Sequence, residues 1–149
     1  MVWGAFSSIG VLPISFPSTK MNSQEYIQIL ECNLKPFVYE NHDANWTFQQ
    51  DNASIHNSRA TQEWLRVHNI DVLQWPACSP DQNPIENLWG ILVRKIYEHQ
   101  RKYNSLVDLK RAVIEAWNGI SGETLQNLIK SMPQRIFELI ENKGMQTNY

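Results

Sequence analysis

Residues 46–56 read WTFQQDNASIH, and the fold is inferred first from this stretch. Thr47 to Gln50 is a short β-prone run that stops at an Asp-Asn turn signal. Asp51 is therefore predicted at the carboxyl end of a strand. The simpler alternative is that Asp51 only forms a turn, since aspartate followed by asparagine is common in turns.

Residues 79–90 read SPDQNPIENLWG and predict the start of a helix. Asn83 suits the N-cap, Pro84 the first helical position and Glu86 the third. Glu86 could simply complete a capping box by bonding back to the Asn83 amide. Alternatively, Asp51 and Glu86 could converge on a divalent metal, because one acid ends a strand and the other opens a helix. Carboxylate oxygens suit Mg²⁺ or Mn²⁺.

Both motifs resemble the catalytic domain of the Tc/mariner superfamily of DNA transposases, the DDE enzymes with a ribonuclease-H-like fold. Asp51 in FQQDNASIH is similar to the family's second catalytic aspartate, and Glu86 in SPDQNPIENLWG is similar to its glutamate. The 34 residues between them are typical of the Tc-like branch. The opening MVWGAFSSIGVLPI and the closing SMPQRIFELIENKGMQTNY also look like this family. The resemblance therefore covers essentially the whole chain.

The resemblance implies an α/β fold of the ribonuclease-H-like kind, a mixed sheet flanked by helices, in a single domain over residues 1–149. It implies cut-and-paste transposition by metal-dependent phosphoryl transfer, with Asp51 and Glu86 as catalytic residues and ligands of a two-ion Mg²⁺ or Mn²⁺ site. The implied partner is DNA, as transposon ends and a TA target. A second copy of the chain or an intact transposase is a further possible partner, which the resemblance itself does not imply. The implied location is the nucleus, with neither a membrane nor a small-molecule substrate as partner.

The sequence departs from the family pattern at the first catalytic aspartate. In the family this residue lies upstream of the VWG segment, here residues 2–4, so the central first strand is expected to be missing. The helix-turn-helix DNA-binding modules of the family are also not expected. The acids before Asp51 fall in a predicted helix or its following loop: Glu25, Glu31, Glu40 and Asp43. We therefore expect the polypeptide alone to be inactive and marginally stable or self-associating.

An alternative function follows from the same departure. The chain could be a non-catalytic remnant of a decayed transposon that acts, if at all, as a protein-interaction module.

The composition narrows the kinds of partner and site. The chain's net charge of −2 does not indicate a strong nucleic-acid binder, and the basic pairs at 94–95, 101–102 and 110–111 fit a solvated helix face. No apolar run approaches the roughly 20 residues that a membrane span needs. Cys32 and Cys78 lack zinc spacing.

Four further residues near the two acids are candidates for contacts around a metal: Asn52, His56, Asp81 and Asn83. His56 could be a ligand or orient a phosphate, but a hydrogen-bonded structural histidine is the simpler interpretation. Asp81 is interpreted as a loop-former, with contact to a metal or its water shell as the alternative.

Local patterns predict the remaining elements. Asn22, with Glu25 three residues on, predicts the start of a helix that ends near Asn41. The other expected elements are a hairpin from residues 1–6 and 11–16, strands at 47–50 and 70–74, and helices at 58–69, 84–96, 105–117, 121–130 and 133–142. Asn57 or Ser58 is expected to cap the first of these helices.

Overall fold

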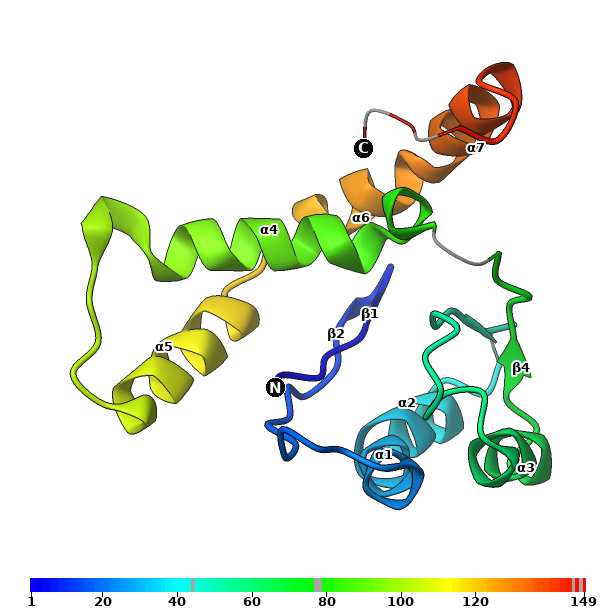
Figure 1. Cartoon of the computed structure of the whole chain (residues 1–149), viewed down its shortest axis with the longest axis horizontal. Helices are drawn as coiled ribbons and strands as arrows, with labels where there is room; N and C mark the ends of the chain where they lie inside the picture. Colours follow the sequence, from blue (N-terminus) through cyan, green and yellow to red (C-terminus); the bar gives the residue numbers. More distant parts are fainter. Residues whose placement is uncertain (44, 77–78, 146, 148) are drawn as a thin grey trace. The chain divides into compact units, whose positions relative to one another are not determined.

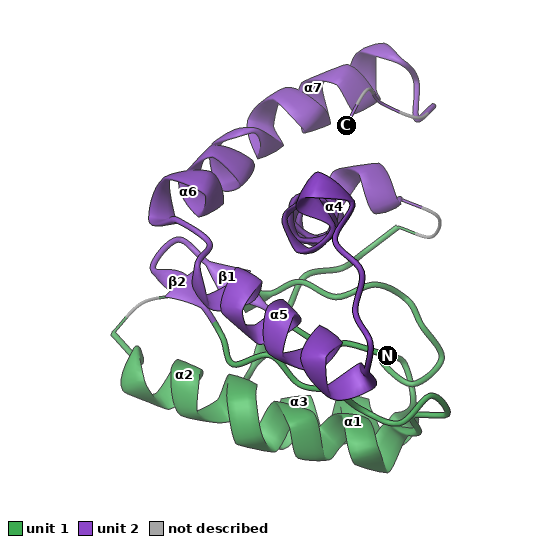
Figure 2. Ribbon diagram, turned by 90° about the vertical axis from the view of Figure 1, so that its left-hand side faces the viewer, with its two compact units in different colours: residues 1–4, 12–78 green, residues 5–11, 79–149 purple. Residues whose placement is uncertain are grey.

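The computed structural model describes residues 1–43, 45–76, 79–145, 147 and 149. The chain divides into two compact units (Figure 2). Unit 1 consists of residues 1–4 and 12–78, and unit 2 of residues 5–11 and 79–149. Asp51 therefore belongs to unit 1 and Glu86 to unit 2.

The predicted N-terminal hairpin is confirmed, but its strands are shorter than predicted. β1 (Phe6–Ser7) pairs antiparallel with β2 (Gly10–Val11), and a single further bridge joins Trp3 to Ser15. Between these pairings one arm of the hairpin has two residues and the other has three. The longer arm contains Pro13, which has no backbone N–H to donate. Unequal arms and a missing donor explain why the ladder is interrupted.

The helix predicted after Asn22 begins with α1 (Ser23–Ile29). The Asn22 Oδ1 atom accepts a hydrogen bond from the Glu25 amide at 2.9 Å, so the predicted cap is confirmed. The Glu25 carboxylate does not bond back to Asn22. It accepts hydrogen bonds from the backbone amide and the hydroxyl of Ser18, each at 2.6 Å. This carboxylate therefore holds the connector that precedes the helix.

The same helix widens before it ends. α1 continues through a π-helical turn (Leu30–Leu34) into α2 (Lys35–Glu40), where the Lys35 amide donates to the Leu30 carbonyl five residues back. Pro36 explains this change, because it has no N–H for an ordinary helical bond. The Asn33 side chain donates to the Ile29 carbonyl at 2.8 Å and so satisfies an acceptor within this region.

A β-α-β arrangement completes unit 1. β3 (Thr47–Phe48) and β4 (Asp71–Val72) pair in parallel, and α3 (Arg59–Val67) connects them. Each strand is shorter than predicted: among the described residues, Thr47 pairs with Asp71 and Phe48 with Val72. Asp51 accordingly lies in the turn after β3 rather than directly at its last residue. Of the two predicted caps, Asn57 and Ser58, the structure has Ser58, whose Oγ accepts from the Thr61 amide.

Unit 2 contains α4 to α7, which are coloured from green to red in Figure 1 and purple in Figure 2. Short 3₁₀ turns precede and follow α4, and in chain order the elements are Pro80–Gln82 (η2), α4 (Pro84–Ile96), Glu98–Gln100 (η3), α5 (Leu106–Asn118), α6 (Gly122–Lys130) and α7 (Met132–Glu141). α4 contacts α5 and α6, and α6 contacts α7. The predicted helices are thus confirmed with their bounds shifted by one residue or less.

The cores follow the predicted helical periods. In α4 the buried residues Leu88, Leu92 and Ile96 recur every fourth position and define one inward face. Trp117 of α5 is fully buried, and its ring stacks on that of Trp89 with centroids 5.2 Å apart. These two rings are therefore packing residues. Unit 1 buries Tyr26, Leu30, Leu34, Leu65 and Ile70.

In the described part of the chain, no helix is long and apolar enough to cross a membrane. Cys32 is exposed with a free thiol. Cys78 lies outside the described residues.

Candidate functional site

The Asp51 carboxylate is bound on one side only. Its Oδ1 atom accepts a hydrogen bond from the Ala53 amide at 3.0 Å and lies 2.6 Å from Nδ1 of His56. Oδ2 makes no hydrogen bond with any residue that the structure describes, and the side chain is 58% exposed. The bond from the Ala53 amide is one that a turn-forming aspartate makes. One oxygen is used for the turn, and the other remains available.

Through His56, Asp51 is connected to two buried side chains that the sequence analysis did not single out, Tyr26 and Gln50. The His56 side chain is 17% exposed, and its ring lies 4.4 Å from the ring of Tyr26. The Tyr26 hydroxyl donates to Oε1 of Gln50 at 2.7 Å and is also hydrogen-bonded by the Trp3 side chain. His56 is therefore packed on one side and bonded to Asp51 on the other, as a structural histidine would be.

Burial keeps the Tyr26 hydroxyl protonated. It raises the pKa of Tyr26 above its ordinary value; the Trp3 hydrogen bond acts against this rise, and the negative charge of Asp51 adds to it. Tyr26 thus keeps its proton and remains a hydrogen-bond donor to Gln50. The available signal in the sequence was Gln50 itself, a polar residue in a β-prone run next to Asp51.

Asn52 holds the Asp51 turn to the segment after β4. Its Nδ2 donates to the Trp75 carbonyl at 2.7 Å, and its Oδ1 accepts from Asn57 at 3.1 Å. Both ends of the amide are therefore engaged in contacts that shape the turn.

Glu86 lies in the first turn of α4, as predicted. The capping-box alternative is wrong, because the Asn83 amide donates to the Pro80 carbonyl at 2.9 Å instead. Glu86 is exposed, and its carboxylate makes no hydrogen bond or ion pair with the described residues. Asn83 is the N-cap residue but forms no side-chain cap. The orientation of Glu86 therefore depends on the backbone of this turn.

Asp81 is bound to the C-terminal segment. Its Oδ2 atom accepts from the amide and the hydroxyl of Thr147, at 2.9 and 2.7 Å. Burial alone would raise the pKa of Asp81, but the hydrogen bonds from Thr147 and Gln82 outweigh it and hold the pKa below its ordinary value. This bonding favours the structural interpretation of Asp81.

The predicted site residues thus form two groups. Unit 1 brings together Asp51, Asn52 and His56, and unit 2 brings together Asp81, Asn83 and Glu86. The convergence of Asp51 and Glu86 on one metal stays a prediction. Asp51 Oδ2 and the Glu86 carboxylate accept no hydrogen bond from the described residues, and such oxygens suit a hard divalent cation. Among the described residues, no cluster of three or more His, Cys, Asp or Glu side chains could hold a metal.

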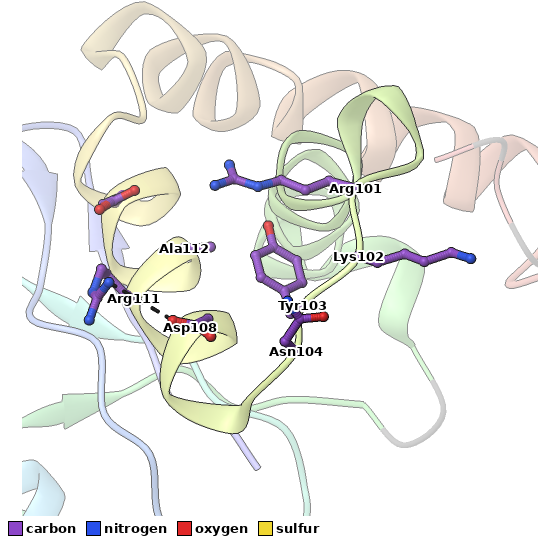
Figure 3. A pocket seen from close by; sticks show the side chains of 8 residues that line it. Arg101, Lys102, Tyr103, Asn104, Asp108, Arg111 and Ala112 are labelled. Atoms are coloured by element: carbon purple, nitrogen blue, oxygen red, sulfur yellow. Dashed lines mark ion pairs between the residues drawn. The ribbon is translucent and has the colours of Figure 1, made fainter.

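A pocket of about 340 Å³ lies elsewhere in unit 2 (Figure 3). Its lining combines three basic side chains with two acids, and Arg111 lies 3.9 Å from Asp108. Lys102 points away from Arg101. None of the predicted site residues lines it, and the mixed charge does not indicate an anion site. The lining residues are Arg101, Lys102, Tyr103, Asn104, Asp108, Arg111, Ala112 and Glu115.

Comparison with known proteins identifies the family. The family described as "DDE superfamily endonuclease" matches residues 2–110, which include both motifs. The chain belongs to this DDE family. The resemblance to Tc/mariner transposases is confirmed, and the chain corresponds to their catalytic domain.

Relatives within the DDE family are transposases of nematodes. The chain is 44% identical over 149 residues to the Tc3 transposase of Caenorhabditis elegans, covering 100% of this chain and 45% of that protein. It is 37% identical to the Tcb1 transposase of Caenorhabditis briggsae, covering 100% of this chain and 54% of that protein. The chain thus spans about half the length of these relatives.

Solved structures confirm the ribonuclease-H-like α/β fold. The catalytic domain of the Mos1 mariner transposase matches with a TM-score of 0.86 and 22% identity, covering 99% of this chain and 75% of that chain. A pre-cleavage Mos1 transpososome matches with a TM-score of 0.87 and 21% identity, and the match covers 99% of this chain and 45% of that chain.

Proposed function

We propose that this chain is the part of a cut-and-paste DNA transposase that performs metal-dependent phosphoryl transfer, with Asp51 and Glu86 as its catalytic carboxylates. One observation carries the proposal: Asp51 is held through Oδ1 by Ala53 and His56, while Oδ2 makes no hydrogen bond with the described residues and the side chain is 58% exposed. A carboxylate fixed at one oxygen and open at the other suits a metal ligand.

The metal would be Mg²⁺ or Mn²⁺, held by Asp51 and Glu86. Mos1 catalytic-domain structures with Mg and with Mn support this choice. A bound pair of such ions supplies activation of the attacking oxygen and stabilisation of the leaving one. The chain's own contribution is orientation: His56 and Ala53 fix the Asp51 carboxylate, and the first turn of α4 presents Glu86.

DNA is the proposed substrate, as transposon ends and a TA target. A paired-end complex of Mos1 with a transposon end and a Mos1 strand transfer complex support this partner. Such chemistry on chromosomal DNA would take place in the nucleus. Contact with a second copy or with an intact transposase is also proposed, because the strands that the structure describes pair into two-stranded sheets, in which every strand has an edge that could pair with another chain.

A polypeptide of these 149 residues, tested by itself, is proposed to be inactive. Asp51 and Glu86 supply two of the three acids of the family pattern, and Glu25, Glu31 and Glu40 lie on the α1–α2 helix instead. With two acids, two cations would remain under-neutralised.

The experiment transfers these residues into a complete enzyme. In Tc3 transposase, the matching segment is replaced by residues 1–149, and excision of the element is measured with Mg²⁺. We expect the chimera to excise the element. Excision should be lost when Asp51→Asn or Glu86→Gln is introduced into the chimera, and the isolated chain should not cleave DNA. A chimera that excises equally well with either acid replaced would contradict the proposal.

A further inference from the structure

A buried arginine of α7 contacts both sides of the turn that carries Glu86. Arg135 is 1% exposed. Its Nη1 donates to the Asp81 carbonyl at 2.8 Å and to Oδ1 of Asn87 at 2.7 Å. Asp81 lies five positions before Glu86 in the sequence, and Asn87 is the residue directly after Glu86. One guanidinium thus joins the loop before α4 to the first turn of that helix.

Thr147, near the C-terminus, is hydrogen-bonded to the same loop. Thr147 donates its amide and hydroxyl to Oδ2 of Asp81, and Gln82 adds a third donor at 3.3 Å. The Arg135 guanidinium also lies 4.5 Å from the ring centroid of Tyr149. Residues beyond the segment 2–110 that matches the DDE family therefore hold a motif inside it.

The turn at Glu86 is not fixed by a side chain at the helix start. The Asn83 side chain forms no cap hydrogen bond with the first turn of α4. The Glu86 carboxylate makes no bond with the described residues that could orient it. Its position therefore follows the backbone from Asp81 to Asn87, and Arg135 binds both ends of that stretch.

We propose that Asp81, Arg135 and Thr147 form a C-terminal clamp that positions Glu86 for metal binding. These three residues act by positioning Glu86 and are not themselves proposed to bind the metal. The inference rests on the proposed role of Glu86 as a ligand. In this proposal Arg135, from the closing SMPQRI segment, and Thr147 both help to position Glu86.

Amide hydrogen exchange of the full 149-residue chain tests the clamp without any metal. Thr147→Val keeps the shape and removes one hydroxyl donor, and Thr147→Pro removes the amide donor. Exchange at the Asn83 and Glu86 amides is expected to rise about three- to tenfold in each variant. Thr19→Val, at an exposed threonine, is the matched control and should change nothing at these amides. Unchanged exchange in both Thr147 variants would overturn the clamp.

Mn²⁺ titration then separates positioning from general stability. Thr147→Val should weaken Mn²⁺ binding several-fold, and the same change in a Glu86→Gln background should weaken it no further. Arg135→Lys keeps the charge but loses the planar fork, and should behave like Thr147→Val. Equal losses in both backgrounds would contradict positioning. If Glu86→Gln itself leaves Mn²⁺ affinity unchanged, the proposed function fails, while amide exchange still decides whether the clamp exists.

Discussion

The Nδ1 atom of His56 lies 2.6 Å from the Oδ1 atom of Asp51, on a ring that packs against buried Tyr26. A surface carboxylate is thereby connected to the core of unit 1. The orientation of Asp51 depends on how firmly this histidine is held, and that dependence can be measured.

Replacing His56 should weaken the metal site more than the fold. His56→Ala removes the contact to Oδ1, and we expect Mn²⁺ affinity to fall about tenfold, as for other residues that orient metal ligands. His56→Asn can still donate a hydrogen bond and should recover part of the loss. His42→Ala is the control, because its side chain is 76% exposed. If alanine at 56 left Mn²⁺ affinity at the wild-type value, His56 would have no orienting role.

Removing the Tyr26 hydroxyl should destabilise the chain. Tyr26→Phe leaves Oε1 of the buried Gln50 without this donor, at a cost of about 1–3 kcal/mol in the free energy of unfolding. Urea denaturation followed by circular dichroism measures this change. Tyr39→Phe, on a residue that is 60% exposed, should have no comparable effect. Equal stability of the two variants would argue against the buried hydrogen bond.

The packing of unit 2 should depend on Trp117. Trp117→Ala removes a fully buried ring that stacks on Trp89, and we expect a loss of about 3–5 kcal/mol in unfolding free energy. Val107→Ala, at a position 65% exposed on the same helix, serves as the control for urea denaturation. A Trp117 variant as stable as the control would mean that this ring is not a core residue.

Asp81 should make stability depend on pH in the acid range. Its pKa is lowered in the folded chain, so its contribution is complete above the unfolded value of about 3.9 and is lost as the pH falls through the lower folded value. The difference in melting temperature between wild type and Asp81→Asn should be constant from about pH 5 to 7 and shrink below about pH 4. Asp43→Asn, at a side chain 97% exposed, is the control. If the difference in melting temperature between wild type and Asp81→Asn instead grew as the pH fell, the pKa of Asp81 would not be lowered by folding.

Local signals in the sequence predicted the helices well. The start of α4 at Pro84 and its buried face at Leu88, Leu92 and Ile96 depend on residues within a few positions of one another. The caps at Asn22 and Ser58 are equally local. Strand lengths were overestimated because β propensity does not reveal how many residues find a partner.

The contacts around the candidate site could not be predicted in the same way. The bond from Tyr26 to Gln50 joins residues 24 positions apart, and that from Arg135 to Asp81 joins residues 54 apart. Such pairs are set by tertiary packing. The two acids themselves were found from their motifs, and the groups that hold them required the structure.

Calorimetric titration with Mn²⁺ tests the central claim most directly. The wild-type chain is compared with Asp51→Asn, Glu86→Gln and the double variant, with Asp43→Asn as a control for general loss of charge. If both acids hold the metal, each single change weakens binding and the double change abolishes it, while the control binds as wild type does. Unchanged binding in the double variant would show that Asp51 and Glu86 do not form the metal site.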